Sequence, residues 1–468
     1  MANEWAFVSV RTLADALRAG DTTSRELTTY FLDRLEKHGP KLNALVALTR
    51  ERALRDADEA DADFARGVIR SPLQGIPYGP KDLLATSDVP TTWGAVPYRN
   101  QQFDSDAAVI QQLSAAGAVL IGKLAMVELA GGWGYDQPNA ALTGPGRNAW
   151  NRERWAGGSS SGSGAAVAAG LVPFAIGTET WGSIHCPSVF NGITGLRPTY
   201  GRVSRAGAMA LSWTLDKIGP MARDATDCML VLQAIAGPDH ADAPTLGAPM
   251  LTITPPSGPL RIGVLESSIE HSAPGVGTNA TSALDVLGKF GSVLPMSLPE
   301  LPMDEAASMI IMCEAAAAFE EFIAEGKSTE LTAPEDRMGM WHALAAPAVD
   351  YLRAMRVRAR ATAAMNQIFE RFDILVAPTY SVVAPLAEGS FDEHFDKHDA
   401  VSLSGMGNLV GLPSITVPTG LGEEGLPTGI ELLGRWWDES RIVQLAEAFQ
   451  GATGHHLAQP PDWALAQS

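Results

Sequence analysis

The chain has 468 residues, 46% of them hydrophobic and 19% charged, so it can bury a large core. Its formal net charge of −19 disfavours nonspecific binding to nucleic acid or anionic membranes. The N-terminus lacks a secretory signal, and no stretch approaches the ~18–20 apolar residues of a membrane span. The three cysteines are too few and too scattered for a disulfide framework. We therefore expect a cytoplasmic protein.

The first predicted elements are helices, which fill residues 9–66. Ser9 is placed to cap the first helix and Gly20 to end it. A second helix begins at Asp21 or Ser24, and a third, rich in Ala, Arg, Asp and Glu, runs over about 45–67.

Beyond residue 70, short apolar strands alternate with helices. Strands are expected near 75–84, 118–122, 172–177, 261–265, 373–379, 413–418 and 429–433. Helices are expected near 106–116, 163–169 and 440–451, with a mostly helical insertion over 299–370. This alternation predicts a mixed or parallel sheet, and the strands on both sides of the insertion favour one α/β domain over 1–468.

Two serines and one lysine stand out in glycine-rich surroundings. Ser159 begins a Gly/Ser loop that leads into the apolar run AAVAAG, Ser183 ends the sequence TWGS, and Lys81 lies in GIPYGPKDLL. Amide hydrolysis needs a nucleophile, a base, an acid for the leaving nitrogen and donors for the oxyanion. A lysine can be the base only when burial keeps it neutral.

The sequence TWGS predicts an oxyanion hole. A tight turn over Thr180, Trp181, Gly182 and Ser183 would aim successive backbone N–H groups at one point.

The chain resembles the amidase signature family in a series of motifs that occur in the family's order: GGSSSGSGAAVAAG, the GSI core, GLRPTYGRVS, DKIGP, DILVAPT and NLVGLPSITVP. The similarity covers roughly residues 10–450 and is strongest over 71–225. It implies a central twisted mixed β-sheet covered by helices on both faces, and chemistry without metal or organic cofactor.

The resemblance also implies the role of each site residue. Ser183 corresponds to the nucleophile, Ser159 to a bridging serine on a cis peptide bond, and Lys81 to the base. Gly158 gives the backbone of the Ser159 loop its conformational freedom. Ser160 supports the network of Lys81, Ser159 and Ser183 by hydrogen bonding.

The sequence departs from the family pattern at four positions around these serines. Glu179 replaces an Asp, Trp181 a Gly, His185 an Arg and Ser161 a Gly. Trp181 would be strained if the fold required a positive φ there. Glu179 and His185 form, by hypothesis, a substituted acid–base pair.

Aromatic residues near the signature predict a substrate pocket. We expect Trp181 to wall it, and Trp133, Tyr135 and Trp155 either to line it or to fill core. Such a pocket would suit a small-molecule aryl amide or aryl carbamate (urethane), with esterase side activity. The protein is expected to be a monomer or homodimer.

Four other interpretations remain open. The chain could be the amidase-like subunit of a glutamine-dependent amidotransferase, or a pseudoenzyme. G-x-S-x-G also fits residues 158–162 with Ser160 as an α/β-hydrolase nucleophile, which would need a late histidine. The late histidines are His394, His398, His455 and His456, and the first two have the i, i+4 spacing of metal ligands.

Overall fold

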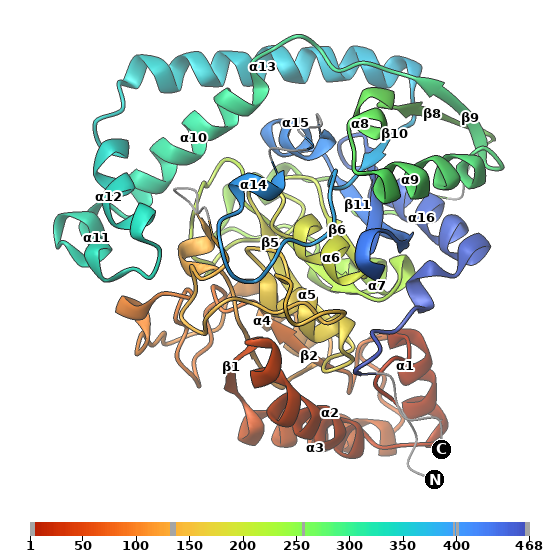
Figure 1. The fold of residues 1–468 in the computed structure, drawn as a ribbon. Coiled ribbons are helices and arrows are strands. Elements are labelled where there is room, and N and C mark those ends of the chain that lie inside the picture. Colours follow the sequence, from red (N-terminus) through yellow and green to blue (C-terminus); the bar gives the residue numbers. More distant parts are fainter. Residues whose placement is uncertain (1–4, 132–136, 255–257, 396–397, 399–401, 464–468) are drawn as a thin grey trace.

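A computed structural model describes residues 5–131, 137–254, 258–395, 398 and 402–463 (Figure 1). Ten strands form one sheet in the order β3-β2-β5-β7-β6-β11-β12-β10-β8-β9. They are β2 (Pro77–Pro80), β3 (Val119–Leu120), β5 (Phe174–Glu179), β6 (Thr194–Arg197), β7 (Lys217–Ala222), β8 (Leu260–Val264), β9 (Gly291–Pro295), β10 (Ile374–Pro378), β11 (Ser414–Leu421) and β12 (Pro427–Gly434).

The sheet is mixed, as predicted. Pairing is parallel at its two ends, in β3-β2-β5 and in β10-β8-β9. The strands between them pair antiparallel. The fold class is therefore α/β with helices on both faces of the sheet, as expected.

Sixteen α-helices are described. They are α1 (Val10–Ala19), α2 (Ser24–His38), α3 (Arg50–Ala65), α4 (Ala108–Ala115), α5 (Ser161–Ala168), α6 (His185–Asn191), α7 (Ala225–Ile235), α8 (Glu266–Glu270), α9 (Pro274–Leu287), α10 (Met303–Ala318), α11 (Glu320–Ala324), α12 (Pro334–Ala343), α13 (Ala348–Arg371), α14 (Asp392–Phe395), α15 (Leu403–Val410) and α16 (Glu439–Thr453). Figure 1 shows α10 and α13 arching over the opposite end of the molecule from α1, α2 and α3. In the described part of the chain, no helix is long and apolar enough to cross a membrane.

The N-terminal prediction is right for two helices and wrong at the start of the third. Ser9 caps α1 through its hydroxyl and Gly20 ends it at φ 77°. The segment Leu45–Leu48 is a strand, β1, that pairs antiparallel with β4 (Gly122–Leu124). A Cβ on Gly122 would lie 2.8 Å from the Ala47 carbonyl oxygen, so the pairing depends on a glycine far along the chain.

The hydrophobic core has two large parts. One packs α1, α2, α7 and α16 around the strands of the sheet. The other joins α10, α13 and α15 beside β10 and β12. The predicted helical insertion contains α10, α11, α12 and α13. The second core thus fixes α10 and α13 to the sheet, whereas α11 packs with the first core.

Candidate active site

Lys81 follows β2, and its side chain reaches toward the neighbouring strand β5. Its backbone N–H donates to Ile176 O (2.9 Å), and its Nζ donates to Ser159 Oγ (2.7 Å) and Thr178 Oγ1 (2.9 Å). The side chain has no exposed surface. Burial lowers the pKa of Lys81 to about 7, and the nearby carboxylates of Asp216 and Glu179 oppose only part of that shift.

The loop before α5 holds Ser159 and Ser160. The Gly158–Ser159 peptide bond is cis, and both serines are buried. Ser160 N donates to Ser183 O (3.3 Å), and Ser160 Oγ donates to Thr178 O (3.2 Å). These bonds fix the Ser159 loop beside β5 and beside the loop of Ser183.

Ser183 lies in the turn between β5 and α6. Gly182 takes the left-handed conformation there (φ 81°), and Trp181 has no positive φ, so the condition for strain at Trp181 is not met. Cys186 N donates to Gly182 O (2.7 Å), which closes the turn. Among the described residues, no backbone acceptor pairs with the N–H groups of Trp181, Gly182 or Ser183, so these donors are available to an oxyanion.

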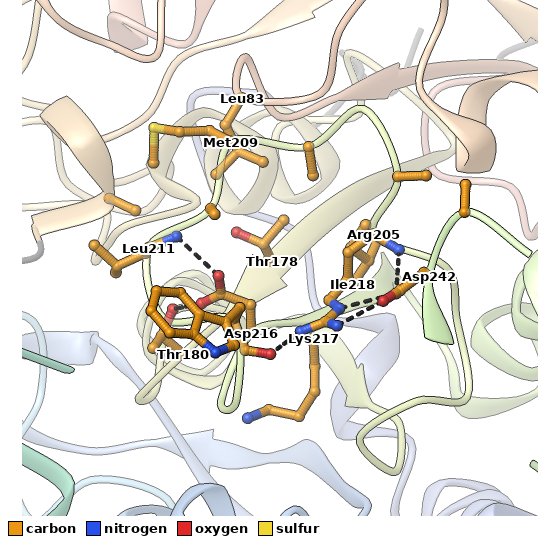
Figure 2. Close-up of a pocket in the computed structure, with 16 residues that line it drawn as sticks. Leu83, Thr178, Thr180, Arg205, Met209, Leu211, Asp216, Lys217, Ile218 and Asp242 are labelled. Carbon is orange, nitrogen blue, oxygen red and sulfur yellow. Dashed lines mark hydrogen bonds and ion pairs between the residues drawn. The ribbon is translucent and has the colours of Figure 1, made fainter. Parts of the chain in front are cut away.

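A cavity of about 180 Å³ adjoins this site. Its wall includes Thr178, the second partner of Lys81, together with Thr180 and Asp216. Figure 2 shows Thr178 between Leu83 and Met209 on one side and Asp216 on the other. Asp216 accepts from Thr180 Oγ1 (2.6 Å) and from two backbone N–H groups, while burial raises the pKa of its carboxyl.

Of the predicted pocket aromatics, the structure describes Trp155 and Trp181, and neither lines the cavity. Trp133 and Tyr135 fall outside the described residues. Trp155 is 3% exposed and packs on Phe391 with ring centroids 4.6 Å apart in a small core cluster, and Trp181 packs against the cluster of α10, α13 and α15. The aromatic side chain on the cavity wall is Trp213, which the sequence analysis did not select.

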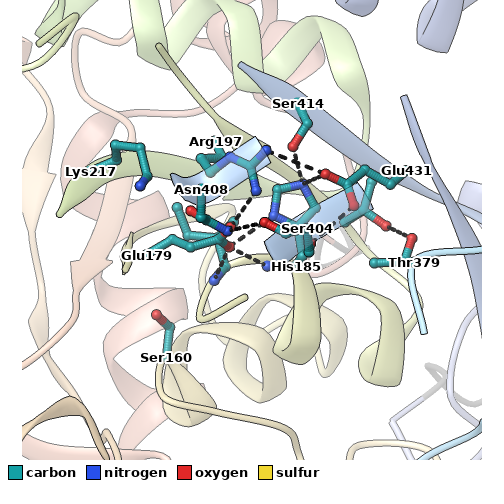
Figure 3. Close-up of polar contacts among 12 residues, drawn as sticks. Ser160, Glu179, His185, Arg197, Lys217, Thr379, Ser404, Asn408, Ser414 and Glu431 are labelled. Carbon is teal, nitrogen blue, oxygen red and sulfur yellow. Dashed lines mark hydrogen bonds and ion pairs between the residues drawn. The ribbon is translucent and has the colours of Figure 1, made fainter. Parts of the chain in front are cut away.

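Glu179, at the end of β5, organises a buried network that includes His185 and Arg197 (Figure 3). Its Oε2 accepts from Ile184 N (2.8 Å) and His185 N (3.0 Å) and lies 2.8 Å from His185 Nδ1. Its Oε1 accepts from Arg197 Nη1 (2.7 Å) and Asn408 Nδ2 (2.8 Å). Burial opposes ionisation of Glu179, but His185 and Arg197 hold the pKa of its carboxyl well below the usual range.

The network continues through His185 to strands β11 and β12. His185 Nε2 lies 2.8 Å from Ser414 Oγ, and Arg197 Nη2 donates to Glu431 Oε1 (3.4 Å). Glu179 and His185 therefore do pair, as hypothesised, and both are fully buried. Their contacts fix the N-terminus of α6, directly after the nucleophile candidate.

Two of the late histidines contact backbone carbonyls through their rings. His394 Nε2 lies 2.8 Å from Val383 O, and His398 Nδ1 lies 3.2 Å from His271 O. His456 accepts from Arg223 through its carbonyl oxygen. Within the described ranges, no group of three or more His, Cys, Asp or Glu side chains is arranged to hold a metal ion.

Sequence reasoning missed Thr178, Arg197 and Asn408. All three lie inside the motifs quoted above or beside them: Thr178 precedes Glu179, Arg197 is in GLRPT, and Asn408 begins NLVGLPSITVP. The motifs marked the segments, but only the folded chain shows which side chains meet.

The chain is similar to known proteins over nearly its whole length. A family model described as Amidase matches residues 26–443. The chain is 35% identical to a glutamyl-tRNA(Gln) amidotransferase subunit of Alcanivorax borkumensis, over 96% of this chain and 97% of that protein. It is also similar to the solved structure of native peptide amidase from Stenotrophomonas maltophilia, with a TM-score of 0.84, 31% identity and coverage of 98% and 99% of the two chains. A third similar structure is described as an unexpected vestigial protein complex that reveals the evolutionary origins of an s-triazine catabolic enzyme, with a TM-score of 0.86, 30% identity and coverage of 97% and 100%.

Proposed function

Because the chain belongs to the amidase family, we propose that it hydrolyses a linear amide through an acyl-enzyme on Ser183, with Ser159 and Lys81 as the proton relay. One observation carries the proposal: the fully buried Nζ of Lys81 lies 2.7 Å from Ser159 Oγ. Among the described residues, no carboxylate lies within 4.0 Å of that Nζ. An amine in this position is neutral in a large fraction of molecules near neutral pH, so it can accept a proton.

Acylation moves one proton along the two serines. Ser183 Oγ attacks the carbonyl carbon while its proton passes to Ser159 and the Ser159 proton passes to Lys81. The N–H groups of Trp181, Gly182 and Ser183 stabilise the oxyanion. As the C–N bond breaks, Lys81 returns its proton through Ser159 to the leaving nitrogen.

Deacylation uses the same groups in the same order. Water attacks the acyl carbon and its proton passes through Ser159 to Lys81. The bond to Ser183 Oγ then breaks, and the relay returns the proton to that oxygen. The products are a carboxylic acid and an amine or ammonia.

Thr178 fixes the amine for this exchange. In the neutral form, an N–H of Lys81 donates to Thr178 Oγ1, which leaves the lone pair free to accept from the Ser159 hydroxyl. Thr178 is in turn held by a backbone bond to Ser160 Oγ (3.3 Å). Ser160 supports the relay in this way without reacting.

Replacing the nucleophile tests the proposal. Ser183→Ala should abolish turnover of an acetanilide, and a fluorophosphonate should label the wild type at Ser183. Ser188→Ala is the matched control, because its buried hydroxyl lies on the adjacent helix α6 without a hydrogen-bond partner among the described residues. Retained activity in Ser183→Ala, or labelling at another residue, would contradict the proposal.

Aryl amides and aryl carbamates belong to the proposed substrate range, because both can acylate Ser183. A matched panel of an anilide, an aliphatic amide, an ester and a carbamate measures the preference. Higher kcat/KM for the aryl compounds supports this range, and a preference for a small aliphatic amide contradicts it. We also propose that the enzyme acts in the cytoplasm as a monomer or homodimer.

A component of a glutamine-dependent amidotransferase is the second candidate. It is favoured by the 35% identity to such a protein over 97% of that protein's length. An activity assay of the purified chain alone distinguishes a free-standing amidase from an amidotransferase component. Hydrolysis of an anilide without any partner supports the free-standing amidase, whereas release of ammonia from glutamine as the sole reaction supports the amidotransferase component.

A further inference from the structure

A groove of about 410 Å³ lies on the helical insertion. It runs between α10 and the segment that joins α12 to α13, and its lining includes five alanines together with Leu344 and Tyr351. Trp213 lines both this groove and the cavity beside Thr178 and Thr180. The two spaces are therefore neighbours, with one indole between them.

The backbone around Trp213 is tied down on both sides. Glu314 of α10 accepts from Ser212 Oγ and from Thr214 N (3.1 Å), and Arg358 of α13 donates to Thr214 O (2.9 Å). Tyr200 OH donates to Trp213 O (2.7 Å). Trp213 is 44% exposed, so a fixed backbone presents a side chain that is open to solvent.

The sizes of the two spaces indicate that they are used together. Ligand sites generally measure about 300–1,000 Å³. The cavity, at about 180 Å³, is below that range, and the groove, at about 410 Å³, lies within it. A substrate too large for the cavity can extend past Trp213 into the groove.

The chemistry of the groove disfavours an anionic occupant and offers apolar contact. Its one buried carboxylate, Glu314, is saturated by Ser212, Thr214 and Tyr351. A second carboxylate, the exposed Glu320, lies on the lining and would repel an anion. The alanines and Leu344 offer apolar contact and no donors from their side chains.

We infer that the substrate amide carries an uncharged apolar arm, which passes Trp213 and lies in the groove between α10 and the α12–α13 connection. Trp213 is then a residue that determines specificity. This inference rests on the proposed amide hydrolysis and adds the substrate class to it.

Two substrate series test the inference. One varies the acyl chain of an anilide from acetyl to dodecanoyl, and the other varies an N-alkyl chain on acetamide. We expect kcat/KM to rise in one series, by up to about fourfold for each buried methylene, until the groove is filled. A flat response in both series overturns the inference. Absence of acetanilide hydrolysis would instead contradict the proposed function itself.

Trp213→Ala should lower the ratio of kcat/KM for the long-chain substrate to kcat/KM for acetanilide by at least about tenfold. Trp341→Ala is the matched control, because Trp341 is 45% exposed on α12 and lines neither space. An equal effect of the two variants overturns the role of Trp213.

Chemical modification of Cys313 tests occupation of the groove without a substitution that could disturb folding. It lines the groove and is partly exposed, whereas Cys186 and Cys228 are buried. Modification with benzyl methanethiosulfonate should lower the rate with the long-chain substrate at least about tenfold and spare acetanilide. Cys313→Ser should resist the reagent. Equal loss with both substrates, or no loss with either, contradicts occupation of the groove.

Discussion

Two buried lysines on neighbouring segments, the proposed base Lys81 and Lys123, have different partners. Both have fully buried side chains. Lys123 Nζ lies 3.0 Å from Asp82 Oδ1 and donates to Thr91 Oγ1 (2.8 Å). Lys81 contacts two hydroxyl groups instead. Asp82, the residue that follows Lys81 in the sequence, thus supplies its carboxylate to Lys123.

The two lysines differ in how closely a carboxylate approaches to oppose the effect of burial on the pKa. Burial lowers the pKa of Lys123, and the contact with Asp82 opposes that shift directly. Burial also lowers the pKa of Lys81, but the carboxylates that oppose it act from a greater distance. Burial alone therefore does not make a general base, because a buried lysine must also lack a carboxylate in contact.

The largest expected effect comes from removing the uncompensated amine. Lys81→Met should lower kcat by about 10⁴-fold, at the upper end of general-base contributions. Lys81→Arg should lose as much, because a guanidinium cannot give up its proton at these pH values. Steady-state kinetics on acetanilide measures both. Appreciable activity in the arginine variant would contradict a neutral base at this position.

Removing the partner of Lys123 should affect stability more than chemistry. Asp82→Asn leaves a buried ammonium without its carboxylate, so we expect a loss of about 3–5 kcal/mol in the free energy of unfolding. Urea unfolding measures it. The double variant Asp82→Asn with Lys123→Met removes both charges and should recover part of the loss. A change below about 1 kcal/mol in the single variant would show that the pair is not needed.

The Glu179 network should couple to catalysis through the turn that holds Ser183. Glu179→Gln and His185→Gln should each lower kcat with little change in KM, because both residues fix the N-terminus of α6. A double-mutant cycle should give a coupling of about 0.5–3 kcal/mol. Strictly additive losses of activation free energy in the two variants would contradict a functional pair.

The pH dependence is the smallest of these effects. With the pKa of Lys81 at about 7, the neutral fraction rises about tenfold from about pH 6 to about pH 8, and kcat/KM should rise with it. Unfolded lysine titrates at about 10.4, so between these values the unfolded state binds more protons and the contribution of Lys81 to stability increases with pH. A flat activity profile would count against Lys81 as the base.

Much of this site could be predicted because its parts are local. Lys81, Ser159 and Ser183 each lie in a short glycine-rich motif, and the apolar strand before Ser183 is visible as a run of buried residues. The pairing of β1 with β4 was not predictable in this way. Leu45–Leu48 looks helical until its partner near Gly122 is known.

The features that could not be predicted from the sequence depend on contacts between distant segments. Asn408 bonds to Glu179 across 229 residues of sequence, so no local pattern could show that Glu179 is saturated with donors. Trp155 and Trp213 are both tryptophans near quoted motifs, yet one fills core and the other separates two cavities. Which of them is exposed depends on α10, α13 and α14, whose positions the sequence pattern does not give.

The most direct measurement is an NMR titration of the lysine side-chain amines in the intact enzyme, with Lys81→Met and Lys123→Met to assign the two signals. We expect Lys81 to titrate with a pKa of about 7 and Lys123 to stay protonated to higher pH. A Lys81 signal that stays protonated up to about pH 10, as for an exposed lysine, would contradict the account.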